Sequence, residues 1–308
     1  PLHVVPPTFF IDGEAARLLA EADVVLSLDW LDLAGTLKAA GVNLDKTKIV
    51  HCSYDAYAHK APSADHQGLA PADIALACSP ESLVSNVIDA IDRISGTPPQ
   101  HVWWTPSETT ADVKVGLHSA ITQLDIAKAL DRARGDQDLC LTQVSLGWPS
   151  ATCDFAGPLD YLGRDGGAGI GSGPGIAVGA ALGLAGSGRI PVAIIGDGDH
   201  AMGATAIWSA VHHKLPLVVL IANNRSYMND ERHQQRVAEM RDRPVNNKWI
   251  GQRMEDPEID HAGLARAQGA EGFGPVTEHG ELETAIGRAL NVAGGGGVAV
   301  VDIHIVRD

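Results

Sequence analysis

The chain has 308 residues, of which 45% are hydrophobic and 20% charged, a composition typical of a globular protein with about two domains. Its formal net charge of -15, without a basic stripe, argues against a nucleic-acid partner. No apolar run approaches the ~20 residues of a transmembrane helix, and no basic segment of a secretory signal opens the chain. We therefore expect a soluble, cytoplasmic protein that binds neither a membrane nor a nucleic acid.

Cysteine and histidine do not form a recognisable metal motif. The four cysteines show neither a C-x-x-C pair nor a zinc spacing, which predicts reduced thiols: Cys52, Cys78, Cys140 and Cys153. The thirteen histidines are scattered, and the adjacent pair His212 and His213 would face different directions on a helix.

Helices and strands are expected to alternate along the first 95 residues. The predicted helices cover residues 14–22, 31–40 and 80–94, and the predicted strands cover 23–28, 48–52 and 73–77. This alternation indicates part of an open parallel sheet. Residues 96–118 contain three prolines and are expected to form a linker.

A second α/β unit is expected from residue 119 to 308. Its predicted helices cover 119–134, 201–213 and 281–292, and its predicted strands cover 139–144, 192–195, 217–222 and 298–305. The strand, helix and strand between 192 and 222 form a right-handed crossover unit. The predicted fold class is α/β, with open, mostly parallel sheets flanked by helices.

Two neighbouring strands of this unit end in polar residues that suit a cation. Gly196, Asp197 and Gly198 follow one apolar run, and 24 residues separate them from Asn223 and Asn224, which follow the next. Ligands bind beyond the carboxyl ends of parallel strands, and hard oxygen ligands there suit a divalent cation carrying a phosphate. The alternative is that both motifs are ordinary turn residues that end two strands.

Other phosphate-binding motifs are absent from the sequence. No G-x-x-x-x-G-K-[ST] occurs, so a P-loop is excluded. The glycines at 169, 171, 173 and 175 alternate and do not fit G-x-G-x-x-G, which disfavours a nicotinamide oxidoreductase.

The spacing of these motifs resembles the fingerprint of thiamine-diphosphate-dependent enzymes of the acetolactate synthase and benzoylformate decarboxylase type. The resemblance implies that Asp197, the Asn224 side chain and the Ser226 carbonyl hold Mg²⁺ on the cofactor diphosphate. The glycine-rich segment 167–175 is similar to the one that precedes this fingerprint, where a bulky residue, here Ile170, bends the cofactor. Further cofactor contacts implied by the resemblance are Gly169, Gly196, Gly198, Asp199 and Tyr227.

The resemblance also implies a domain arrangement. Residues 1–95 are similar to the later part of a middle domain and 119–308 to the diphosphate-binding domain. The pyrimidine-binding domain, whose glutamate activates the cofactor, is expected to come from outside this chain. We therefore expect an incomplete site, a fragment or one half of a split enzyme, inactive alone and assembled as a homodimer or tetramer.

Three residues are candidates for catalysis. Asp230 stands where related decarboxylases have a glutamate that acts on the substrate; the alternative is a charge in a first helical turn. His200 is expected either to face the active site or to cap a helix. His233 is expected either to contact the substrate or to lie on a solvated helix face, and Trp148 to line the pocket or the core.

The predicted function is thiamine-diphosphate- and Mg²⁺-dependent decarboxylation or carboligation of a 2-oxo acid, with aromatic 2-oxo acids as one option. The alternative is a homologue that binds the cofactor without turning over a substrate. Pocket shape depends on the absent domain, so the sequence leaves the substrate open.

Overall fold

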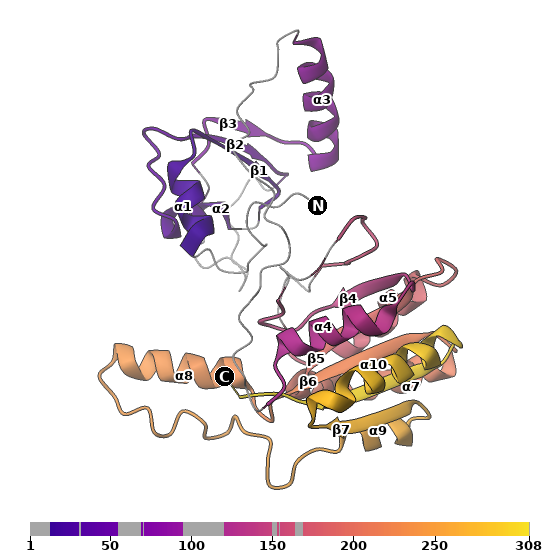
Figure 1. The fold of residues 1–308 in the computed structure, drawn as a ribbon. Helices are drawn as coiled ribbons and strands as arrows, with labels where there is room; N and C mark the ends of the chain where they lie inside the picture. The colour runs from indigo at the N-terminus through magenta and orange to yellow at the C-terminus, as the bar shows by residue number, and fades with distance from the viewer. Residues whose placement is uncertain are drawn as a thin grey trace. The chain divides into compact units, whose positions relative to one another are not determined.

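The computed structural model describes residues 13–30, 32–54, 69, 71–94, 120–149, 153, 155–163 and 169–307. The chain divides into two compact units, Leu2–Glu108 and Thr109–Asp308 (Figure 1). The predicted linker, 96–118, lies outside the described residues. The predicted domain limits, 1–95 and 119–308, stay predictions.

The first unit contains a three-stranded parallel sheet in the order β1-β2-β3. Its strands are β1 (Val24–Leu28), β2 (Lys48–Cys52) and β3 (Ile74–Leu76), and its helices are α1 (Gly13–Glu21), α2 (Leu33–Ala39) and α3 (Pro80–Arg93). Side chains alternate between the two faces of a strand, so Val25 and Ile49 share one face, where Leu33 and Leu37 of α2 pack on them.

The second unit is built on a five-stranded parallel sheet in the order β4-β5-β6-β8-β7. Its strands are β4 (Leu139–Gln143), β5 (Ile190–Gly196), β6 (Leu217–Asn223), β7 (Glu271–Val276) and β8 (Val298–His304). The helices are α4 (Gln123–Arg134), α5 (Gly173–Gly183), α6 (Asp197–Gly203), α7 (Ala206–His212), α8 (Met228–Met240), α9 (His261–Ala267) and α10 (His279–Gly294).

Both faces of this sheet are covered, which explains why its central strands are continuously apolar. Helices α4 and α10 lie together on one face (Figure 1), where Ile194 of β5 and Leu220 of β6 are buried. Helices α5, α7 and α9 supply the core of the other face, with Ile195 and Ile221 from the same two strands. The burial of β5 and β6 on both faces makes them the rigid centre of the unit.

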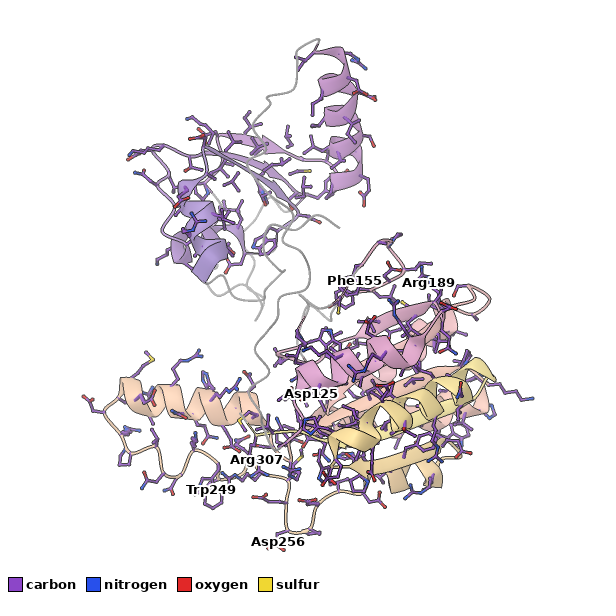
Figure 2. The ribbon with its side chains drawn as sticks, in the orientation of Figure 1. Asp125, Phe155, Arg189, Trp249, Asp256 and Arg307 are labelled. Carbon is purple, nitrogen blue, oxygen red and sulfur yellow. The ribbon has the colours of Figure 1, made fainter. Side chains whose placement is uncertain are left out.

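Local sequence signals set several helix ends. The predicted helix 119–134 begins at Gln123, because Thr122 and Asp125 form a reciprocal capping box; Asp125 is labelled in Figure 2. The predicted helix 201–213 is two helices, α6 and α7, and the first begins at Asp197. Among the described helices, none is both long and apolar enough to cross a membrane.

The predicted α/β class with parallel sheets is confirmed, but three elements were not expected. Helix α5 contains four glycines, which lower helix propensity, and its stability depends on packing against β5. Strand β7 contains two glycines and a proline and lies at the edge of the sheet. Helix α9 is only seven residues long and was overlooked within a long polar region.

Gly272 is expected to be required where β7 approaches α9. A Cβ at this position would overlap the backbone carbonyl of Ala262, whereas a Cβ at Gly287 of α10 would meet no atom within 4 Å. We predict that Gly272→Ala lowers the free energy of unfolding by ~1–3 kcal/mol through overpacking. The control Gly287→Ala should raise it by ~0.5–1 kcal/mol, because alanine favours the helix. Urea unfolding followed by circular dichroism measures both changes; a Gly272→Ala variant as stable as the wild type would contradict the prediction.

Candidate functional site

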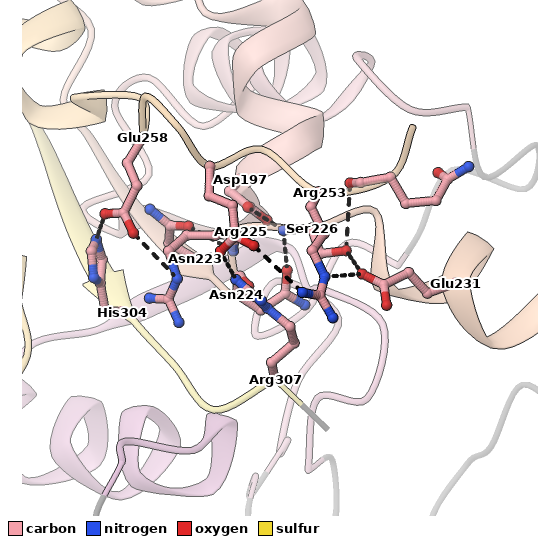
Figure 3. Close-up of polar contacts among 12 residues, drawn as sticks. Asp197, Asn223, Asn224, Arg225, Ser226, Glu231, Arg253, Glu258, His304 and Arg307 are labelled. Carbon is pink, nitrogen blue, oxygen red and sulfur yellow. Dashed lines mark hydrogen bonds and ion pairs between the residues drawn. The ribbon is translucent and has the colours of Figure 1, made fainter. Parts of the chain in front are cut away.

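The predicted ligand residues meet at the carboxyl edge of the central strands. Gly196 at the end of β5 lies beside Ala222 of β6, so Asp197 and Asn224 follow adjacent strand ends. The backbone N–H of Ser226 lies 3.1 Å from Asp197 Oδ2 and 3.0 Å from Asn224 Oδ1 (Figure 3). The carboxylate and amide oxygens therefore converge on one point.

Asp197 is buried without a counter-charge. Its side chain is 2% exposed, and burial raises its pKa to about 6, although backbone N–H groups oppose the shift. No ion pair to Asp197 occurs within the described part of the chain. A bound cation would offset this desolvation and favour the anion, so the site fits a metal.

The composition of the site limits what kind of metal ion it can hold. Across the described ranges, no three His, Cys, Asp or Glu side chains lie close enough to form a metal site by themselves. One carboxylate, one amide oxygen and backbone carbonyls form a hard donor set that leaves positions for phosphate oxygens and water. This set suits Mg²⁺ carrying a phosphate better than a zinc ion held only by side chains.

Asn223 holds the bend of the ligand loop, a role that the sequence analysis missed. Arg225 adopts a φ of 57°, in the left-handed region that is unfavourable for a side-chain-bearing residue. The Asn223 Oδ1 atom accepts the Arg225 N–H at 3.0 Å, and its Nδ2 donates to Asp302 of β8 at 2.9 Å. The buried asparagine therefore anchors the strained loop to the neighbouring strand.

Charged side chains brace the same loop from two other elements (Figure 3). Glu231 of α8 is 2% exposed; it accepts a hydrogen bond from Ser226 Oγ and lies 3.5 Å from Arg253 Nε. Arg307, which follows β8, donates to the Asn224 carbonyl at 3.0 Å and pairs with Glu255 at 2.8 Å. Glu231 was not among the predicted site residues, because nothing in the sequence indicates its burial.

Gly198 is required by the close approach of Tyr227. A Cβ at Gly198 would overlap the Tyr227 ring, so only glycine lets the loop pack on the first turn of α6. Burial, and then the charges of Asp197 and Asp230, raises the pKa of the Tyr227 hydroxyl. The ring therefore stays neutral and forms a wall beside the predicted metal ligand.

Asp199 joins the two predicted motifs. Its Oδ1 accepts the N–H of Gly171 at 2.6 Å and that of Gly173 at 3.1 Å. A Cβ at Gly173 would overlap the Asp199 carboxylate. This contact holds the turn that carries Ile170, whose side chain is 49% exposed, whereas Gly167 and Ala168 of the same segment lie outside the described residues.

The three candidate catalytic residues do not cluster. Asp230 is partly buried in the first turn of α8, and His233 is exposed on the same helix. His200 is fully buried, with its Nδ1 atom 2.8 Å from Nδ1 of His261 on α9. Burial, followed by the proximity of His261, lowers the pKa of His200 to about 3, so the ring is neutral.

These positions bear on the alternatives left open by the sequence. No side-chain hydrogen bond caps α6, so His200 does not fill the helix-capping role. Trp148 packs against the main core and donates to Cys153 Sγ at 3.3 Å, which favours its core role. The catalytic roles of Asp230, His200 and His233 stay predictions.

The second unit of the chain matches a known protein family. The family described as thiamine pyrophosphate enzyme, C-terminal TPP binding domain, matches residues 143–303. Benzoylformate decarboxylase from Pseudomonas aeruginosa is 36% identical over 122 residues, which are 40% of this chain and 21% of that protein. This match therefore spans about a fifth of that relative's length.

Two solved structures share the fold over 96% of this chain, each with a TM-score of 0.71. The thiamine-diphosphate-dependent 4-hydroxybenzoylformate decarboxylase of Rhodococcus jostii is 20% identical, and the benzoylformate decarboxylase of Polynucleobacter necessarius is 18% identical. The chain spans 51% of each of these structures. Since the family match covers more than half of the 308 residues, the chain belongs to the thiamine pyrophosphate enzymes that carry this C-terminal cofactor-binding domain.

Proposed function

We propose that the chain supplies the diphosphate-binding half of an Mg²⁺-dependent site for decarboxylation or carboligation of a 2-oxo acid. The observation that carries the proposal is the convergence of Asp197 Oδ2 and Asn224 Oδ1 on the Ser226 N–H. These oxygens, with the Ser226 carbonyl, would hold the metal on the cofactor diphosphate.

The remaining residues of the site would shape and orient the cofactor. Gly196 and Gly198 let the backbone approach the diphosphate, and Asp199 holds the turn that includes Gly169 and Ile170. Ile170 would support the bent cofactor, and Tyr227 would close the site beside Asp197. Thiamine diphosphate, when bound, supplies an electron sink for a carbanion next to a carbonyl. Asp230, partly buried and near Tyr227, would act on the substrate as a proton donor or as a repelling charge.

Aromatic 2-oxo acids are the proposed substrates. The names of the relatives support them, because one acts on benzoylformate and another on 4-hydroxybenzoylformate. An acetolactate-synthase-like carboligation receives no comparable support. The pyrimidine-binding domain, the homodimer or tetramer and the cytoplasmic location remain predictions from the sequence.

Removal of the Asp197 carboxylate should abolish metal-dependent cofactor binding, because Asp197 supplies the carboxylate of the proposed ligand set. We predict that Asp197→Ala loses the heat of thiamine diphosphate binding that Mg²⁺ induces in the wild type. Isothermal titration calorimetry with and without Mg²⁺ measures this heat of binding. The matched control is Asp131→Ala, whose carboxylate is exposed on α4 and pairs with Arg134. Unchanged affinity in Asp197→Ala would refute the ligand assignment.

The 308 residues alone should not turn over benzoylformate, because cofactor activation needs the glutamate of a pyrimidine-binding domain. We predict no carbon dioxide release from the purified chain, and release after a pyrimidine-binding domain is supplied. Turnover by the chain alone would contradict the incomplete site. Metal-dependent binding that never leads to turnover would indicate the non-catalytic homologue instead.

Glu231 should support the metal ligand loop through Ser226. We predict that Glu231→Ala weakens Mg²⁺-dependent cofactor binding about 10-fold, because the buried Ser226 hydroxyl loses its short bond to the carboxylate and is left with the 3.4 Å contact to the Gln252 carbonyl, at a cost of ~1–3 kcal/mol. Glu239→Ala, on the exposed end of the same helix, should leave the affinity unchanged. Equal affinities for the two variants in the same titration would show that Glu231 does not position the loop.

A further inference from the structure

Two cysteines of the first unit touch each other. Cys52 ends β2, and Cys78 follows β3 by two residues. Their Sγ atoms are 3.7 Å apart, and the Cys52 thiol also donates to the Cys78 carbonyl at 3.2 Å. Both cysteines are free thiols.

The backbone holds the two sulfurs in place. Parallel pairing sets Cys52 opposite Leu76, and the Leu76 carbonyl accepts the N–H of Ser53 at 3.1 Å and that of Cys78 at 3.0 Å. On the other side of β2, the Asp29 N–H donates to the Cys52 carbonyl at 2.7 Å. The contact between the thiols therefore follows from the register of the sheet.

The two thiols differ in their access to solvent. Cys52 is completely buried, whereas Cys78 is partly exposed. Burial, and then the hydrogen bond with Cys78, raises the pKa of the Cys52 thiol. A reagent from solution therefore reaches Cys78 first. Cys52 lies in contact with Cys78 Sγ and can react with a mixed disulfide that forms on it.

A metal explains this pair less well than a covalent bond does. A structural zinc site needs four ligands, and no group of three His, Cys, Asp or Glu side chains that could hold a metal occurs among the residues that the structure describes. The other two cysteines, Cys140 and Cys153, belong to the second unit. The two sulfurs, 3.7 Å apart, must approach by a further ~1.7 Å to reach the ~2.05 Å of a disulfide bond.

We propose that Cys52 and Cys78 form a reversible disulfide by exchange with a low-molecular-weight disulfide such as oxidised glutathione. The Cys78 thiolate attacks one sulfur of the reagent and expels the first thiolate, which leaves a mixed disulfide. Cys52 then attacks Cys78 Sγ and expels the second thiolate, which takes up the proton of the Cys52 thiol. One protein disulfide and two small thiols form from two protein thiols and one small disulfide.

The bond would tie the end of β2 to the turn that precedes α3. Ser79, directly after Cys78, caps this helix by accepting the Ser82 N–H. The disulfide would therefore constrain the connection between β3 and α3, and a thiol reductant would cleave it.

Peptide mapping of the whole chain tests the proposal. After incubation with oxidised glutathione in native buffer, free thiols are alkylated and the protein is digested with trypsin without reduction. Cleavage after Lys48, Lys60 and Arg93 places Cys52 in peptide 49–60 and Cys78 in peptide 61–93. The expected product is these two peptides joined, with full loss of the link after dithiothreitol. Cys140 and Cys153, which share peptide 135–164, should remain alkylated.

Two variants sharpen the result. Cys52→Ser should stop the reaction at a single glutathionyl group on Cys78, whereas the control Cys153→Ser should retain the cross-link. A wild-type protein that keeps both thiols alkylated, or that carries only the mixed disulfide on Cys78, would overturn the proposal. The wild-type map decides the question even if a variant fails to fold.

Discussion

The parallel pairing of β5 with β6 is the constraint on which the rest of the site depends. It brings Gly196 beside Ala222, and the first polar residues after each strand are thereby placed at one edge. Because both strands are buried on both faces, this edge cannot shift without disrupting the core. A carboxylate that is costly to bury is thus held where a cation would stabilise it.

The loop after β6 is not stable by its own backbone preference. Arg225 is held in a left-handed conformation by Asn223, and Asn223 is held by Asp302 of the next strand. Glu231 and Arg307 reach the same loop from α8 and from the end of β8. Contacts from three elements therefore determine the position of two proposed ligands, and a change in any one of them would shift the proposed metal site.

The ends of the central strands were predictable because they depend on local sequence, whereas the predicted helix starts at 119 and 201 differ from the observed starts at Gln123 and Asp197. The apolar runs of β5 and β6, and the turn residues that follow them, indicated the parallel sheet. They also indicated that Asp197 and Asn224 lie at the same edge of it. Asn223 was recognised as part of the motif, but its bond to Asp302 was not predicted, because that partner is distant in the sequence. The role of Glu231 was not predicted, because it depends on burial. Asp199 was expected among the cofactor contacts, and its bonds to Gly171 and Gly173 require a loop that the glycine spacing alone does not specify. The contact between Cys52 and Cys78 depends on the register of β2 and β3 in the same way.

The buried contact between His200 and His261 has a consequence for the proton balance of folding. Two Nδ1 atoms 2.8 Å apart can share only one proton, so the two neutral rings must adopt opposite tautomers, and both rings cannot be imidazolium at once without losing the bond. Burial lowers the pKa of both rings below the value of a free histidine. The unfolded chain therefore binds more protons than the folded one as the pH falls below ~6.5. The free energy of unfolding of the cofactor-binding unit consequently decreases in acid.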